Sequence, residues 1–298
     1  MPFEQKQLLL EVRGRPVTFI PGKKSVSRLP GDWSSPFSGQ GYEPMGYRDF
    51  TLGDDPRRIN LAATARRGRS TIVERIALRE FNILIVIDAS ASMRVREKWE
   101  IQMAAATLQP YSAWKAEISF GIAVSQGADV VSLGIGLGSR HFHRLQRQLR
   151  QLISAKTDYL PSGKRLPLSR CLPVNSMMLF CSDFLDGQGR ARTSHYLAHA
   201  IRRYDFVPIV IQDELDVSFP AIPARTVVPL KNPETGVERD TWLSPEIAVS
   251  IKSAHEHRFR ELLRLFLNKG VHAIHLKSPN IASMSSRIDA FFRRRIGA

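Results

Sequence analysis

The chain has 298 residues but only two cysteines, Cys171 and Cys181, and no long hydrophobic run. A single pair ten residues apart indicates neither a disulfide framework nor a cysteine-based zinc site. No apolar stretch approaches the ~20 residues that cross a bilayer, and the first residues, MPFEQKQLLLEVRGR, lack the pattern of a secretory signal. We therefore expect a cytoplasmic protein with no transmembrane segment.

Acidic residues are too few to balance the basic ones. Lys and Arg number 43 against 28 Asp and Glu, which gives a net charge of +15. Such an excess suits nucleic acid, an anionic membrane surface or an acidic protein. The basic residues fall in separate segments, such as RHFHRLQRQLRQ and the terminal FFRRR, and aromatic residues are not interleaved with them as stacking platforms. Solvated helix faces therefore explain them better than a nucleic-acid groove, and peripheral contact of the C-terminal segment with a membrane is the remaining alternative.

From residue 81 onward the sequence alternates between strand and helix patterns. Residues 81–87, 176–182 and 206–212 are short, continuously apolar runs, as expected of strands covered on both faces. Helical patterns lie between them, and Pro110 should kink or split the first. We predict an α/β domain over residues 79–298, with a mostly parallel sheet flanked by helices and a hairpin excursion near 213–243. Residues 1–78 are rich in turn formers and predict a small, irregular, β-rich N-terminal region.

The first of these strands ends in FNILIVIDASASM, which places Asp88, Ser90 and Ser92 two residues apart. In a loop, such alternating side chains can point their oxygens at one centre, and carboxylate and hydroxyl oxygens suit Mg²⁺ or Mn²⁺. Asp183 also follows a buried strand, and ligands of parallel sheets bind at the carboxyl ends of strands. The alternative is a capped turn, since Asp and Ser favour turns.

These residues resemble the metal-ion-dependent adhesion site of the von Willebrand factor A domain. The DxSxS motif of that family stands here as Asp88-Ala89-Ser90-Ala91-Ser92, and its later aspartate matches Asp183. The family also supplies a threonine, for which Thr157 is the candidate by its order in the chain. The resemblance implies a Rossmann-like fold and a Mg²⁺ (or Mn²⁺) site with five ligands: Asp88, Ser90, Ser92, Thr157 and Asp183.

The upstream sequence resembles the bacterial family called domain of unknown function 58. Its elements stand here as Arg48-Asp49-Phe50, Gly53-Asp54-Asp55-Pro56-Arg57 and Ala65-Arg66-Arg67-Gly68, so that the similarity covers roughly residues 40–298. Many relatives have Asp-Trp where this chain has Asn60-Leu61. As a separate interpretation, the acids and arginines near residue 54 form a turn in which they pair with one another.

The resemblance implies a non-enzymatic, metal-dependent protein-interaction module. Its implied partner is a MoxR-type AAA+ ATPase, acting in chaperone-like assembly or maturation of client proteins, and an acidic client is an additional candidate partner. Two alternatives stay open: a metal-dependent phosphodiester hydrolase, which would use the same cation to polarise a phosphate, and an electrostatic nucleic-acid binder. No Ser-His-Asp or Cys-His arrangement can be distinguished in the sequence.

Overall fold

The computed structural model describes residues 5–21, 33–51, 54–79, 81–126, 129–154, 165–172, 176–185, 195–233 and 235–295. The chain divides into two compact units. The larger combines Met1–Lys24 with Asn82–Ala298, and the smaller is Ser25–Phe81. The N-terminal region predicted over residues 1–78 thus differs in its bounds from the smaller unit, because the first 24 residues group with the larger one.

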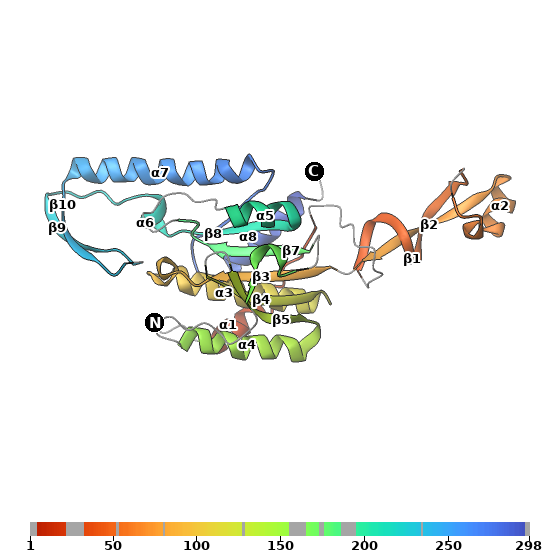
Figure 1. Ribbon diagram of the computed structural model, residues 1–298, viewed down its shortest axis with the longest axis horizontal. Helices are drawn as coiled ribbons and strands as arrows, with labels where there is room; N and C mark the ends of the chain where they lie inside the picture. Colours follow the sequence, from red (N-terminus) through yellow and green to blue (C-terminus); the bar gives the residue numbers. More distant parts are fainter. Residues whose placement is uncertain are drawn as a thin grey trace. The chain divides into compact units, whose positions relative to one another are not determined.

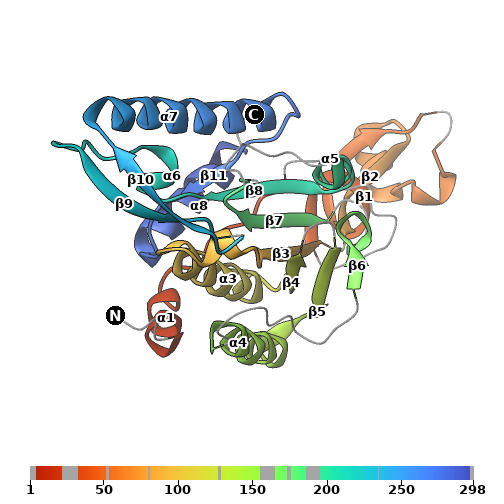
Figure 2. The same ribbon diagram turned by 60° about the vertical axis from the view of Figure 1, so that its left-hand side comes forward.

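The larger unit is built on a seven-stranded sheet with the order β11-β8-β7-β3-β4-β5-β6 (Figure 2). The five strands from β11 to β4 are parallel to their neighbours, and the β4–β5 and β5–β6 pairs are antiparallel. This confirms the predicted mostly parallel α/β sheet. The strands are β3 (Asn82–Asp88), β4 (Ser119–Gln126), β5 (Asp129–Gly136), β6 (Arg165–Pro167), β7 (Met177–Ser182), β8 (Asp205–Ile211) and β11 (Ile274–Leu276).

Helices cover both faces of this sheet, which is why β7 and β8 are buried at every residue (Figure 1). On one face α3 (Lys98–Lys115) contacts α1 (Gln5–Val12), α4 (Gly138–Ser154) and α8 (Ile281–Arg294). The other face packs against α5 (His195–Arg203) and α7 (Pro245–Leu267), through Leu197 and Ile201 of α5 and Leu262 and Phe266 of α7.

Helix α3 runs without a break through Pro110, so Pro110 does not split the helix, which was one of the two expectations. Most of its residues are buried, because the sheet lies on one side and α1, α4 and α8 lie on others. A proline costs one backbone hydrogen bond in a helix interior. Burial of a helix that is apolar on nearly all sides offsets that loss.

The segment that follows α1 is held to the larger unit by residues distant in the sequence. The backbone N–H of Val17 donates to Ser112 Oγ of α3 at 2.9 Å, and that of Thr18 donates to Asp289 Oδ1 of α8 at 3.0 Å. Phe19 is buried and meets Phe292 edge to face, with ring centroids 5.4 Å apart. Residues 5–21 therefore belong to the core of the larger unit.

A long hairpin follows β8 and leads into α7. It comprises β9 (Thr226–Lys231) and β10 (Glu238–Leu243), which pair antiparallel, and it is preceded by the short helix α6 (Glu214–Val217). Ser244 caps α7 by accepting from the Ile247 backbone N–H, and Pro245 occupies the first turn, where its missing N–H costs no helical hydrogen bond. None of the helices in the described residues is long and apolar enough to cross a membrane.

The smaller unit contains the antiparallel pair β1 (Trp33–Asp49) and β2 (Thr71–Arg79), the short helix η1 (Pro56–Arg58), and α2 (Leu61–Arg67). Arg48 binds both oxygens of Asp54 at 2.7 Å, and this pairing holds the pKa of Asp54 well below its usual range. Asp55 accepts from the Arg57 backbone N–H and caps η1. The acids of this turn are thus paired, Asp54 with an arginine six residues earlier.

His275 of β11 makes the larger unit sensitive to acid. Its Nε2 lies 3.3 Å from the Gln212 carbonyl oxygen, and burial lowers its pKa to about 4. A histidine of the unfolded chain titrates near 6.5. The neutral ring therefore contributes stability above pH ~6.5, and this contribution is lost as the pH falls from there towards 4.

We predict that His275→Gln reduces the loss of unfolding free energy between pH 7 and 5. The difference from wild type should approach about 1.4 kcal/mol per pH unit as an upper limit. Urea unfolding at several pH values measures it. His272→Gln replaces an exposed histidine of the same segment and serves as the control. Equal pH dependence of the two variants would contradict the assignment.

Candidate functional site

The carboxyl ends of three adjacent parallel strands supply the polar residues of the site. Asp88 ends β3, Asp183 follows β7, and Asp213 and Asp216 follow β8. Since β3, β7 and β8 are neighbours and point the same way, these residues meet at one edge of the sheet. The structure thus brings Asp88, with the serines two and four residues beyond it, to the edge that holds Asp183. Thr157 lies outside the described residues.

The loop after β3 is organised by the Asp88 carboxylate. Its Oδ1 accepts from the Ser90 backbone N–H at 2.9 Å, and its Oδ2 accepts from Ser182 Oγ at 2.6 Å. The hydroxyl oxygens of Ser90 and Ser92 lie 3.2 Å apart. Ser182 therefore ties the loop after β3 to the end of β7.

Gln102 of α3 fixes the backbone at the end of β3. Its Nε2 donates to the Asp88 carbonyl at 2.8 Å, and its Oε1 accepts from the Asp88 N–H at 3.2 Å. Gln212, after β8, likewise donates to the Asp183 carbonyl at 2.6 Å. Two buried glutamines therefore hold the backbone of the two strand-end aspartates in place.

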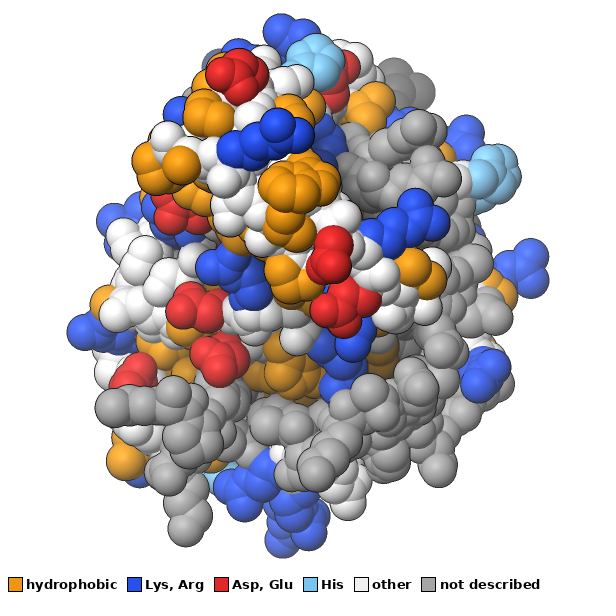
Figure 3. Space-filling view, turned by 90° about the vertical axis from the view of Figure 1, so that its left-hand side faces the viewer, with side chains coloured by type: hydrophobic (Ala, Val, Ile, Leu, Met, Phe, Trp, Pro, Cys, Tyr) orange, Lys and Arg blue, Asp and Glu red, His pale blue; other side chains and the backbone are white. Residues whose placement is uncertain are grey.

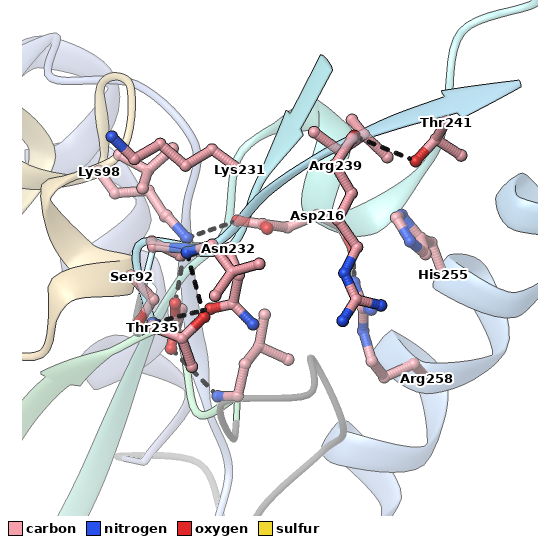
Figure 4. Close-up of a pocket in the computed structure, with 16 residues that line it drawn as sticks. Ser92, Lys98, Asp216, Lys231, Asn232, Thr235, Arg239, Thr241, His255 and Arg258 are labelled. Atoms are coloured by element: carbon pink, nitrogen blue, oxygen red, sulfur yellow. Dashed lines mark hydrogen bonds and ion pairs between the residues drawn. The ribbon is translucent and has the colours of Figure 1, made fainter. Parts of the chain in front are cut away.

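The strongest electrostatic feature of the site is a buried ammonium between two carboxylates (Figure 4). Nζ of Lys98, the first residue of α3, lies 3.0 Å from Asp183 Oδ2 and 3.1 Å from Asp216 Oδ2. Lys98 is 4% exposed and Asp183 is 1% exposed. The other oxygen of Asp183 accepts from the Leu185 backbone N–H at 3.1 Å. A neighbouring pair, Arg96 with Asp213 at 3.1 Å, links the segment before α3 to the N-cap residue of α6.

Burial and charge act in opposite directions on these groups. Burial lowers the pKa of Lys98, but the charges of Asp183 and Asp216 outweigh it, so that this pKa is raised and the amine stays protonated. Burial raises the pKa of Asp88, although hydrogen bonds from Ser182 and Ser90 partly oppose the rise. The site therefore combines a protonated, buried Lys98 with the carboxylate of Asp88, whose ionised form is stabilised by its hydrogen bonds.

One distance at this site suits Mg²⁺, but the carboxylates do not. The separation of the Ser90 and Ser92 hydroxyls is close to the ~3 Å between adjacent ligands of an octahedral Mg²⁺. Asp183, however, has one oxygen on Lys98 and the other on a backbone N–H. Among the described residues there is no group of three or more His, Cys, Asp or Glu side chains able to hold a metal. Arranged in this way, the described residues do not fit a divalent cation, because Lys98 takes the carboxylate that would bind it.

A pocket of about 730 Å³ opens above this edge. Ser92, Lys98, Asp183 and Asp216 line it from the sheet side (Figure 4). The β9–β10 hairpin and α7 provide the other walls, with the polar side chains Lys231, Asn232, Thr235, Arg239, Thr241, His255 and Arg258 and the apolar Leu230 and Val237. On the face seen in Figure 3, basic, acidic and hydrophobic side chains are interspersed. The pocket thus has a charged floor and a mixed basic and apolar rim.

Sequence reasoning missed Lys98, Gln102 and Asp216. Asp216 could have been found, because it lies just beyond a buried strand, like Asp88 and Asp183. Lys98 and Gln102 carry a weaker signal: they are polar residues of a helix whose other residues are mostly apolar. Their spacing of four places both on the same face of α3.

The comparisons with known proteins point to one family and to no established activity. A family model described as "Protein of unknown function DUF58" matches residues 46–257. Uncharacterized proteins of Mycobacterium bovis and Mycobacterium tuberculosis are 27% identical over 242 residues, which covers 77% of this chain and 73% of theirs. Among solved structures, the PilB minor pilin from Streptococcus sanguinis is similar with a TM-score of 0.32 and 9% identity, over 76% of this chain and 64% of that one.

We predict that Gln102→Leu destabilises the larger unit by about 2–4 kcal/mol, because it leaves both backbone groups of Asp88 without their partner. Chemical denaturation measures the change. Gln109→Leu is the matched control on the same helix, since the Gln109 amide is buried and has no hydrogen-bond partner among the described residues. The control should be neutral or stabilising, and equal losses in both variants would contradict the role of Gln102.

Proposed function

We propose that this chain, which belongs to the DUF58 family of unknown function, is a protein-interaction module built on a von Willebrand factor A-type domain. It binds an acidic segment of a partner protein in the pocket above the carboxyl edge of its sheet. The partner proposed from the resemblance is a MoxR-type AAA+ ATPase, and the role is assembly or maturation of client proteins.

The pocket itself is the observation that carries this proposal. Its floor holds Lys98 between two carboxylates, and its rim holds the exposed Lys231 and Arg239 on the hairpin. Apolar side chains such as Leu230 and Val237 lie between the charges. A volume of about 730 Å³ accommodates several side chains. Basic and apolar groups together suit a peptide segment that carries both acidic and hydrophobic residues.

The hydrogen bonding of the floor favours binding over catalysis. Both oxygens of Asp88 and both of Asp183 already accept hydrogen bonds or ion pairs. A general base needs an oxygen that can reach the proton of a substrate or water. Groups this well satisfied instead give a rigid surface, which lowers the ordering cost when a partner binds.

The test is direct binding to a purified MoxR-type ATPase of the same organism, measured by biolayer interferometry. We predict that Lys231→Glu combined with Arg239→Glu weakens binding about tenfold or more, mainly by slowing association, because the two rim charges attract the acidic segment. The control combines Lys252→Glu with Lys269→Glu, which makes the same change in net charge at exposed positions outside the pocket. It should bind as wild type does.

Other outcomes separate the alternative functions. Equal weakening by both pairs of substitutions, together with binding to nucleic acid that falls steeply with salt, would favour an electrostatic nucleic-acid binder. Turnover of a phosphodiester such as bis-p-nitrophenyl phosphate, lost in Asp88→Ala, would favour the hydrolase. Either result would overturn the proposed module.

A further inference from the structure

The ammonium of Lys98 neutralises carboxylate charge that a divalent cation at this site would otherwise neutralise. Its ammonium contacts Asp183 and Asp216, the carboxylates that follow two neighbouring strands. A metal bound by the hydroxyls of Ser90 and Ser92 would also require Asp183, the carboxylate that the sequence assigns to it. Two cations that share one carboxylate repel each other, and the ammonium is part of the chain.

We propose that Lys98 is the resident cation of this site, so that the carboxyl edge is assembled and binds its partner without Mg²⁺ or Mn²⁺. The inference rests on the proposed function only where it concerns the partner, because the assembly of the edge can be measured on the protein alone. It differs from the expectation drawn from the sequence, in which a metal ion holds these residues together.

The surrounding contacts support a built-in cation. The Lys98 side chain is buried, and its position is set by the first turn of α3, whose next turn carries Gln102 bound to the Asp88 backbone. Asp216 is in turn placed by α6, where Asp213 and Asp216 form a capping box with each other's backbone N–H. Arg258 of α7 donates to the Asp216 carbonyl. Each carboxylate around the ammonium is therefore held by its own element.

While Lys98 is paired with Asp183, the hydroxyls of Ser90 and Ser92 are too few and too weak as ligands to hold a metal ion. Each Asp88 oxygen already accepts one hydrogen bond, from the Ser90 N–H or from the Ser182 hydroxyl, so a metal ion would compete with these bonds for the orientation of the carboxylate. Neutral hydroxyls bind Mg²⁺ weakly without a carboxylate, since Mg²⁺ gives up its water reluctantly. Removal of the ammonium should make metal binding favourable, because Asp183 and Asp216 would then lack a counter-charge and could accept a metal ion.

The experiment measures the melting temperature of the full chain in EDTA and in millimolar Mg²⁺ or Mn²⁺. We expect no shift for wild type. We expect Lys98→Met to melt several degrees lower in EDTA and to regain several degrees with the metal, because a ligand that binds only the folded state raises its stability. Lys252→Met, at an exposed position of α7, should show neither effect.

A second variant and a direct titration cover the case in which Lys98→Met does not fold. Lys98→Met combined with Asp183→Asn and Asp216→Asn removes the cation and both counter-charges, and it should fold and ignore the metal. Terbium luminescence titration of wild type should show no saturable binding that Asp88→Ala abolishes. A rise of several degrees for wild type with Mg²⁺, saturable terbium binding of that kind, or a folded Lys98→Met protein that ignores metal would each overturn the inference.

Binding to the ATPase distinguishes this inference from the proposed function. Wild type that binds equally in EDTA and in Mg²⁺ supports both. Because the ATPase itself uses Mg²⁺ to hold its nucleotide, binding that requires Mg²⁺ supports the module, and it overturns the resident cation only if Mg²⁺ also raises the melting temperature of this chain alone. No binding in either condition removes the proposed partner, and the melting temperatures then still decide whether Lys98 or a metal completes the site.

Discussion

The ion pairs of a single buried lysine determine how this site is put together. A charge inside a protein is tolerated only where opposite charges and hydrogen bonds surround it. Lys98 satisfies that condition by joining the start of α3 to the residue after β7 and to α6, three segments far apart in the sequence. Gln102, one turn further along α3, donates a hydrogen bond to the Asp88 carbonyl at the end of β3. One helix face thus sets the relative positions of three strand ends, and the serine-bearing loop takes its shape from them.

Much of the sheet could be predicted from local pattern. Continuous apolar runs marked β3, β7 and β8, because strands covered on both faces need no polar side. The rule that parallel strands present their carboxyl ends at one edge then selected Asp88 and Asp183. Pro110 does not split α3, since packing around the helix outweighs the preference of a single residue. Lys98 was overlooked because its local signal is weak: a lysine at the start of an apolar helix is as compatible with a solvated side chain as with a buried one.

The charges of the site are of two kinds: buried charges on the floor of the pocket and exposed charges on the β9–β10 hairpin. Both oxygens of Asp88 and of Asp183 are bonded within the floor, which gives the floor a fixed shape and lowers the entropic cost of binding. The hairpin carries exposed basic side chains, which in the proposed function would affect how fast an acidic partner arrives more than how tightly it is held. Exposed Trp242 on β10, with Arg225 over its ring at 5.0 Å, adds a large flat surface to the same hairpin. Selectivity for a partner can therefore change by substitution on the hairpin without disturbing the strand ends.

The hydrogen bonds of Val17 and Thr18 to α3 and α8 have a consequence for biosynthesis. During translation, residues 5–21 leave the ribosome long before Asp289 exists, so their contacts with α8 cannot form until that helix has been made. The smaller unit is contiguous in sequence and needs no such delay. Until then the central sheet lacks part of the helical layer that covers one of its faces, so apolar strands stay exposed in the nascent chain. Such intermediates are the kind that chaperones protect, which places the vulnerable stage of this protein before α8 is made.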